Sequence, residues 1–116
     1  MSSPGGDRAS VARAGMHITI VPCRSDNYAY LVRAPDQSRA LCVDPAAAAP
    51  VQRALRQANL ALAAILTTHH HYDHTGGNEA LAAQFDGLRR LGYGPGYTDP
   101  VQDGTEVTVA GLQVKF

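Results

Sequence analysis

The sequence predicts an α/β fold in which a mixed sheet carries helices on one face. Short β-branched runs separated by turn residues fill the region 17–43, and a helix pattern followed by an apolar strand fills 50–67. A second helix pattern at 78–85 then precedes two short alternating strands within 106–116. Strands and helices that alternate in this way indicate a sheet covered by helices.

The region 17–43 is expected to form an antiparallel meander. Its first strand is short and β-branched, which suits an opening or edge strand, and Pro22 is expected to end it. Turn residues at 25–27 and 34–38 separate this strand from two further runs. The three expected strands are 17–21, 28–33 and 39–43.

The segment after the meander has the spacing of an amphipathic helix. Pro50 suits the first turn of a helix, where its missing N–H costs nothing. The apolar run Ala63–Thr67 that follows predicts a buried strand, and sites in α/β sheets usually lie at the carboxyl ends of such strands. The helix face expected to pack on the sheet comprises Val51, Ala54, Leu55, Ala58 and Leu62.

The last third of the chain predicts a helix, a loop and a hairpin. The helix is expected from Asn78, as its cap, to about Phe85, with Glu79 favourably placed in the first turn. Glycine, proline and aspartate are frequent over 92–104, which predicts a loop. The side chains of this helix expected to point inward are Leu81, Ala82 and Phe85. The hairpin strands are 106–109 and 112–116, joined through Ala110 and Gly111.

The segment between the buried strand and the second helix concentrates side chains that bind metals. His69, His71, Asp73 and His74 form the pattern H-x-H-x-D-H. Alternate side chains of an extended segment point the same way, so His69 and His71 can supply two ligands to one zinc ion. A turn after His71 can bring Asp73 and His74 to a second metal, at the roughly 3.5–4 Å spacing that lets two metals share a water.

The neighbours of these four residues support the same interpretation. Gly76 and Gly77 permit a backbone path that a β-carbon would block. His70 points away from the other two imidazoles and is expected to be structural or to support a ligand, and Tyr72 to pack beside the metals. The alternative is a polar loop with chance histidines or loose metal affinity. The order of strand, ligands, glycines and helix favours the metal site.

Composition excludes several classes of function. The 116 residues suffice for one small domain, and ten basic side chains balance ten acidic ones, so nothing indicates a nucleic acid or an anionic membrane as partner. No apolar run approaches the ~20 residues that a membrane span needs. Cys23 and Cys42 have neither metal nor redox spacing, and reduced thiols fit a reducing, cytoplasmic compartment.

Residues 1–15 are small and polar and are expected to be a disordered leader. They lack the apolar region of a secretory signal. Arg8 and Arg13 against the single acidic Asp7 leave a mitochondrial targeting segment as the alternative to a cytoplasmic location.

Together these motifs resemble the metallo-β-lactamase superfamily, and within it most closely glyoxalase II, the hydroxyacylglutathione hydrolases. The run T-H-H-H-Y-D-H-T-G-G-N at 68–78 resembles the metal signature of the superfamily, and Cys42-Val43-Asp44-Pro45 contains its V-D-P motif. The chain looks shortened between Pro95 and Thr98. Further similar segments are 16–22, 25–32, 93–95 and 99–104.

The resemblance implies that 16–116 is the N-terminal half of the αββα sandwich of this superfamily. The implied reaction is hydrolysis of S-2-hydroxyacylglutathione thioesters, such as S-D-lactoylglutathione, to glutathione and a 2-hydroxy acid through a binuclear metal centre. Two Zn²⁺ ions are implied per intact enzyme, with iron or manganese as alternatives. His69 and His71 would hold the first metal, and Asp73 and His74 the second. Asp73 is also the implied catalytic residue, because it helps to orient the nucleophile.

The resemblance also implies two histidine elements and a bridging aspartate further along, whereas no histidine follows His74. Each metal therefore has two protein ligands here, fewer than the three or four that are usual for zinc. We expect a C-terminally truncated domain that is inactive alone. Half of a sandwich would also leave an apolar sheet face uncovered, which predicts self-association.

Asp44 and the assigned reaction each leave an alternative open. Asp44 is expected either to orient a ligand or the metal loop, which the resemblance favours, or simply to end a strand in a turn. The activity could instead be that of another enzyme of the superfamily, a persulfide dioxygenase with one iron or a lactamase-like hydrolase. A third hypothesis is a non-catalytic metal-binding or pairing module that works through its uncovered sheet.

Overall fold

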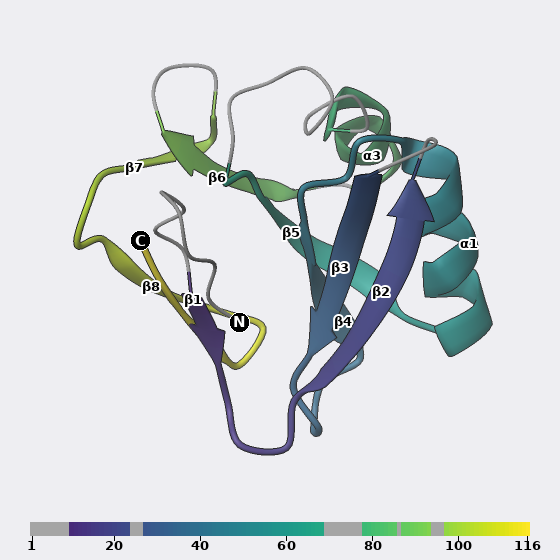
Figure 1. The fold of residues 1–116 in the computed structure, drawn as a ribbon, viewed down its shortest axis with the longest axis horizontal. Helices are drawn as coiled ribbons and strands as arrows, with labels where there is room; N and C mark the ends of the chain where they lie inside the picture. Colours follow the sequence, from purple (N-terminus) through teal and green to yellow (C-terminus); the bar gives the residue numbers. More distant parts are fainter. Residues whose placement is uncertain (1–9, 24–26, 69–77, 86, 94–96) are drawn as a thin grey trace.

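The computed structural model describes residues 10–23, 27–68, 78–85, 87–93 and 97–116. Within these residues two sheets face each other, and two helices lie on the side of the larger sheet that faces away from the smaller one (Figure 1). The helices are α1 (Ala48–Ala58) and α3 (Asn78–Gln84). This arrangement confirms the expected α/β class, with a mixed sheet that carries helices on one face.

The larger sheet has the strand order β2-β3-β4-β5-β6-β7, and the smaller sheet has the order β1-β9-β8. The ladders from β2 to β4 are antiparallel, whereas those from β4 to β7 are parallel. Strands β4 to β7 therefore all end at one edge of the sheet, which we call the carboxyl edge. The larger sheet comprises β2 (His17–Cys23), β3 (Asn27–Arg33), β4 (Arg39–Val43), β5 (Ala61–Leu66), β6 (Arg89–Tyr93) and β7 (Asp99–Val101). The smaller sheet comprises β1 (Ser10–Ala12), β8 (Glu106–Val109) and β9 (Leu112–Lys115).

The expected meander is present, and β4 has the predicted bounds. Strand β2, however, runs through Pro22 to Cys23 instead of ending at the proline. β2 is an edge strand that pairs with β3 alone in the described part of the sheet. A proline is tolerated there, because the side of the strand that lacks an N–H can face away from the neighbouring strand.

A core of apolar side chains lies between the larger sheet and the helices. Val51 and Leu55 of α1 are buried in it, as expected, but Ala58 is exposed and Leu62 belongs to β5. The helix ends at Ala58 because Asn59 takes the left-handed conformation (φ 56°) and its N–H bonds to the carbonyl of Arg56. Neither described helix is long and apolar enough to span a membrane.

A second apolar core lies between the two sheets. The smaller sheet covers the inner face of the larger one so well that Val32, Leu41 and Leu91 are fully buried. The uncovered apolar face that we expected is therefore much reduced. Among the described residues, the large hydrophobic side chains that stay exposed are Ile18 and Ile20 of β2 and Tyr28 of β3.

Two segments expected to lack regular structure contain strands. Ser10–Ala12 form β1, which pairs with β9, so the disordered leader expected over 1–15 is wrong from Ser10 onward, and 1–9 lie outside the described residues. β6, which no sequence pattern predicted, extends into the expected loop 92–104, and β7 forms within that loop. β1 depends on its pairing with β9, and β6 and β7 depend on pairing with β5 and with each other, so the local composition of these short segments does not reveal them.

The hairpin at the end of the chain matches its prediction. Ala110 (φ 48°) and Gly111 (φ 80°) both take positive φ values and connect β8 to β9. Two consecutive residues of this kind form the turn whose twist matches that of the flanking strands. The hairpin carries Val109, Leu112 and Val114 into the core between the sheets.

An ion pair joins the two outermost parallel strands. Arg89 of β6 donates through Nε and Nη2 to Oδ2 of Asp99 in β7, at 3.2 and 2.8 Å. Its Nη1 also reaches the carbonyl of Thr108 in β8 at 3.5 Å. The hydrogen bonds from Arg89 lower the pKa of the Asp99 carboxyl.

The Asp99→Asn variant should be less stable by roughly 0.5 kcal/mol at neutral pH, since partly exposed ion pairs contribute about 0.2–1 kcal/mol. The folded pKa of Asp99 lies below the unfolded value of about 3.9. The contribution is therefore complete above that value and disappears as the pH falls through the folded pKa. Urea denaturation of both proteins at neutral and acidic pH measures this. A stability difference that is independent of pH would contradict the assignment.

Candidate metal centre

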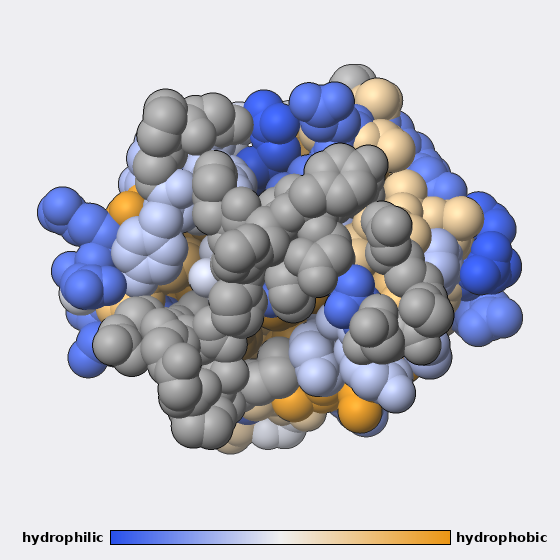
Figure 2. All heavy atoms as spheres, turned by 45° about the horizontal axis from the view of Figure 1, so that its top comes forward, coloured by the Kyte–Doolittle hydropathy of each residue, from blue (hydrophilic) through white to orange (hydrophobic). Residues whose placement is uncertain are grey.

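The structure describes the two ends of the metal-binding motif. Residues 69–77, here called the ligand segment, lie outside the described residues, and with them the four predicted ligands His69, His71, Asp73 and His74. The same holds for His70 and Tyr72. Thr68 before the segment and Asn78 after it are described. Figure 2 turns the top of Figure 1 toward the reader. Hydrophilic residues lie at the left and at the right of the coloured surface in this view.

Strand β5 fixes the start of the ligand segment. Residues 62–66 of this strand are all buried, as the apolar run predicted. The N–H of Thr67 donates to the carbonyl of Leu91 in β6 at 2.9 Å, and the N–H of Asp44 donates to the carbonyl of Leu66 at 2.9 Å. The parallel pairing with both neighbours thus continues to the end of β5, and the ligand segment leaves from the carboxyl edge.

Asp44 binds the residue that immediately precedes the first predicted ligand. Its Oδ1 accepts the backbone N–H of Thr68 at 2.8 Å, and its Oδ2 accepts the hydroxyl of the same residue. Asp44 is 8% exposed and has a φ of 54°, a conformation that aspartate tolerates better than most residues. Of the two readings of Asp44, the orientation of the metal loop is therefore the one that the hydrogen bonds support.

Cys42 of β4, two positions before Asp44, is fully closed to solvent. Burial raises the pKa of the Cys42 thiol well above its usual value, and the neighbouring Cys23 and Asp44 raise it further. Both cysteines are free and buried, as expected for reduced thiols in strands. A buried, protonated thiol is a poor nucleophile and a poor metal ligand.

Asn78 differs from its prediction as a helix cap. It is the first residue of α3, and its Nδ2 donates across to Oγ1 of Thr67 at 3.2 Å. Its Oδ1 is buried and accepts no hydrogen bond within the described part of the chain. Sequence reasoning gave no role to Thr67 or Thr68, although two adjacent hydroxyls between a buried strand and a histidine cluster were a usable signal.

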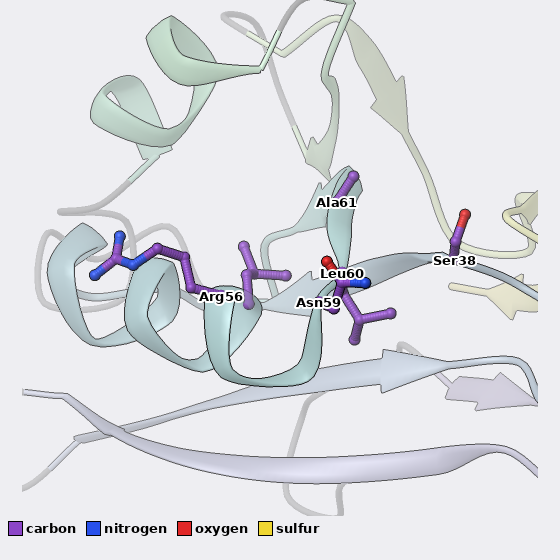
Figure 3. A pocket seen from close by; sticks show the side chains of 6 residues that line it. Ser38, Arg56, Asn59, Leu60 and Ala61 are labelled. Carbon is purple, nitrogen blue, oxygen red and sulfur yellow. The ribbon is translucent and has the colours of Figure 1, made fainter.

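A hollow lies at the end of β5 opposite the candidate metal centre. Its volume is about 470 Å³, and its side chains come from the end of α1, the start of β5 and the turn before β4 (Figure 3). It is separated from Thr67 by the length of β5, about 20 Å at ~3.3 Å per residue. It therefore lies away from the candidate metal centre. The lining residues are Ser38, Leu55, Arg56, Asn59, Leu60 and Ala61.

The donor chemistry of the ligand segment fits a metal ion of the zinc type. Imidazole nitrogen and carboxylate oxygen are common zinc ligands and also bind iron and manganese. The described residues contain no group of three or more histidine, cysteine, aspartate or glutamate side chains that could hold a metal. What they supply is the frame, in which Asp44 holds Thr68 and Asn78 bonds to Thr67.

These features define an α/β sandwich with a candidate metal segment at one edge. The sequence model of the metallo-beta-lactamase superfamily matches residues 24–96, which include the ligand segment. The chain belongs to the metallo-beta-lactamase superfamily.

Curated relatives of the chain carry a more specific name than that of the superfamily. A hydroxyacylglutathione hydrolase of Cyanothece sp. is 43% identical and covers 82% of this chain and 40% of its own length. One from Synechococcus sp. is 41% identical, with coverage of 86% and 42%, and one from Vibrio cholerae is 40% identical, with coverage of 79% and 38%. The chain thus spans about two fifths of the length of these curated relatives, and the resemblance to glyoxalase II is confirmed.

Solved structures confirm the fold. BLEG-1 B3 metallo-beta-lactamase superimposes with a TM-score of 0.71 at 19% identity, over 82% of this chain and 57% of that protein. ETHE1 from Myxococcus xanthus superimposes with a TM-score of 0.64 at 24% identity, over 84% and 45%. At these identities the likeness concerns the sandwich architecture and not the reaction.

Replacing Asp44 by alanine should destabilise the protein by about 2–4 kcal/mol. Two hydrogen bonds to a buried carboxylate are lost, and a β-carbon without a polar group adds about 1 kcal/mol in the left-handed conformation. Asp44→Gly loses the same hydrogen bonds without that strain, so it should be the more stable of the two. Urea denaturation gives both values. Equal stability of the two variants would show that the backbone conformation contributes nothing.

Proposed function

We propose that this chain is part of a metal-dependent hydrolase that cleaves S-2-hydroxyacylglutathione thioesters, such as S-D-lactoylglutathione, to glutathione and a 2-hydroxy acid. The observation that carries the proposal is the match to hydroxyacylglutathione hydrolases at 43% and 41% sequence identity. A match over 82% of the chain includes the ligand segment wherever the match begins. The proposed partner is therefore a small glutathione thioester, and we propose neither a nucleic acid nor a membrane partner.

We assign His69 and His71 to one metal ion and Asp73 and His74 to a second. Zn²⁺ is the ion that this mixture of nitrogen and oxygen donors fits best, with iron or manganese as the alternatives. When bound, such ions make a water nucleophile available near neutral pH and neutralise charge on the attacked carbonyl oxygen. Asp73 is the proposed catalytic residue, because its second carboxylate oxygen can accept a proton from the attacking water and orient it.

The residues at the edge of the sheet contribute by pre-organisation. Asp44 holds both the backbone and the hydroxyl of Thr68, so the chain enters the ligand segment from a fixed direction. Ligands that are already in place need less ordering when the metal and the substrate bind. Because the segment offers two ligands to each metal and catalytic zinc usually has three, we expect hydrolysis only when further ligands complete the centre.

We propose the cytoplasm as the place of action, with the mitochondrion as the alternative. Cys23 and Cys42 are both free and buried, which fits a reducing compartment. We also propose self-association through the surface of β2 that carries the exposed Ile18 and Ile20.

Loss of a residue that hydrogen-bonds to a metal ligand lowers metal affinity roughly 10–100-fold. Replacing His71 by alanine should lower zinc affinity by at least this much, because His71 is assigned as a ligand itself. His70→Ala is the matched comparison and should lower zinc affinity less, because the adjacent imidazole is predicted to point away from the metals and to be structural or to support a ligand. Zinc competition with a chromophoric chelator measures both. Equal losses in the two variants would contradict the assignment of His71 as a ligand.

The reaction itself is tested with S-D-lactoylglutathione and the zinc-loaded chain joined to a C-terminal segment that completes its metal centre, here called the completed protein. Thioester absorbance should decay, the decay should stop when a chelator removes the metal, and added zinc should restore it. Metal binding without any thioester hydrolysis would overturn the proposed reaction. Iron content together with oxygen uptake would do so as well, and would indicate an oxygenase instead.

A further inference from the structure

The carboxamide of Asn78 is buried, and one of its two polar atoms has no hydrogen-bond partner among the described residues. The residue is 8% exposed, and its Nδ2 donates to Oγ1 of Thr67 at 3.2 Å. Its Oδ1 accepts no hydrogen bond from the described residues. A buried carbonyl oxygen without a donor is unfavourable, so such an atom in a native structure calls for an explanation.

The hydrogen bond between Asn78 and Thr67 joins the two ends of the ligand segment. The partners are eleven positions apart in the sequence. Thr67 is 2% exposed and is held by its N–H bond to Leu91 in β6. The two side chains therefore meet where the chain enters the ligand segment and where it leaves it.

Helix α3 is anchored independently of this hydrogen bond. Leu81 is fully buried in the core between the larger sheet and the helices. Gln84 at the other end of α3 accepts a hydrogen bond from Gln52 of α1 at 2.5 Å. Loss of the Asn78 carboxamide should therefore release the end of the ligand segment without releasing the helix.

We propose that Asn78 is a positioning residue for the metal centre. Its bond to Thr67 sets the distance between the two ends of the ligand segment, and its Oδ1, which has no partner among the described residues, is available to a hydrogen-bond donor of the metal-bound centre. Fixing both ends of a short segment lowers the entropy that its ligands lose when they bind. The inference rests on the proposed function only in taking His69, His71, Asp73 and His74 as metal ligands, not in the choice of substrate.

Three variants test this role. Asn78→Ala removes both polar atoms, Thr67→Val removes the hydroxyl partner, and Thr67→Ser keeps that hydroxyl. Gln84→Ala is the matched control, because it also removes a side-chain amide and a hydrogen bond from α3, but at the far end of the helix. Zinc affinity, the absorption spectrum of the cobalt-substituted protein and stability in urea are measured for each.

We expect Asn78→Ala to weaken zinc binding about tenfold or more and to change the cobalt spectrum. Thr67→Val should weaken it in the same direction, Thr67→Ser should retain most of the affinity, and Gln84→Ala should leave it within about twofold. The double variant of Asn78→Ala with Thr67→Val should bind zinc no more weakly than the worse single variant, because both remove one interaction.

Unchanged zinc affinity and an unchanged cobalt spectrum in Asn78→Ala, with only a loss of stability, would overturn the proposal and leave Asn78 a structural residue. If Asn78→Ala does not fold, the comparison of Thr67→Val with Thr67→Ser decides, and equal zinc affinities would overturn the proposal. Absence of zinc binding by the unsubstituted protein would overturn it together with the ligand assignment. Failure of the completed protein to hydrolyse the thioester, with the expected affinity changes present, would overturn the proposed reaction alone.

Discussion

The bond between the Asp44 carboxylate and Thr68 is the interaction on which the candidate site depends. It connects Asp44, the residue after β4, to Thr68, the second residue after β5, at the point where the chain leaves the sheet for the ligand segment. Asp44 can make it because the parallel pairing of the two strands brings their carboxyl ends together, and because its positive φ turns the chain there. Burial at 8% exposure strengthens hydrogen bonds to a carboxylate that water would otherwise weaken.

The two cores make this edge rigid from both sides of the sheet. Helix α1 packs Val51 and Leu55 against the outer face, and the small sheet packs Val11 and Leu112 against the inner face. A strand such as β5, with five consecutive buried residues, can be accommodated only when both faces are covered. The packing of the sandwich therefore supports the position at which the ligand segment leaves the sheet.

Strong local patterns were sufficient for the meander of the larger sheet and for the hairpin of the smaller one. The β-branched runs of the meander and the turn at Ala110 and Gly111 were predicted correctly, because each carries its signal within a few residues. β1, β6 and β7 were missed, because Ser10–Ala12, Arg89–Tyr93 and Asp99–Val101 carry little strand signal of their own and are strands through their pairing with β9, β5 and β6. Asn78 was misread as a cap, since the hydroxyl it contacts lies eleven positions away.

The amino-acid sequence by itself determined the chemistry of this protein: which nitrogen and oxygen donors follow one another in the ligand segment, and hence the family to which the chain belongs. The tertiary structure alone decided which side chains brace that segment. The physical reason is range. Donor type is a property of each residue, and spacing is a property of its neighbours, whereas the contacts of Asp44 with Thr68 and of Asn78 with Thr67 arise only after distant strands have paired and a helix has packed on them.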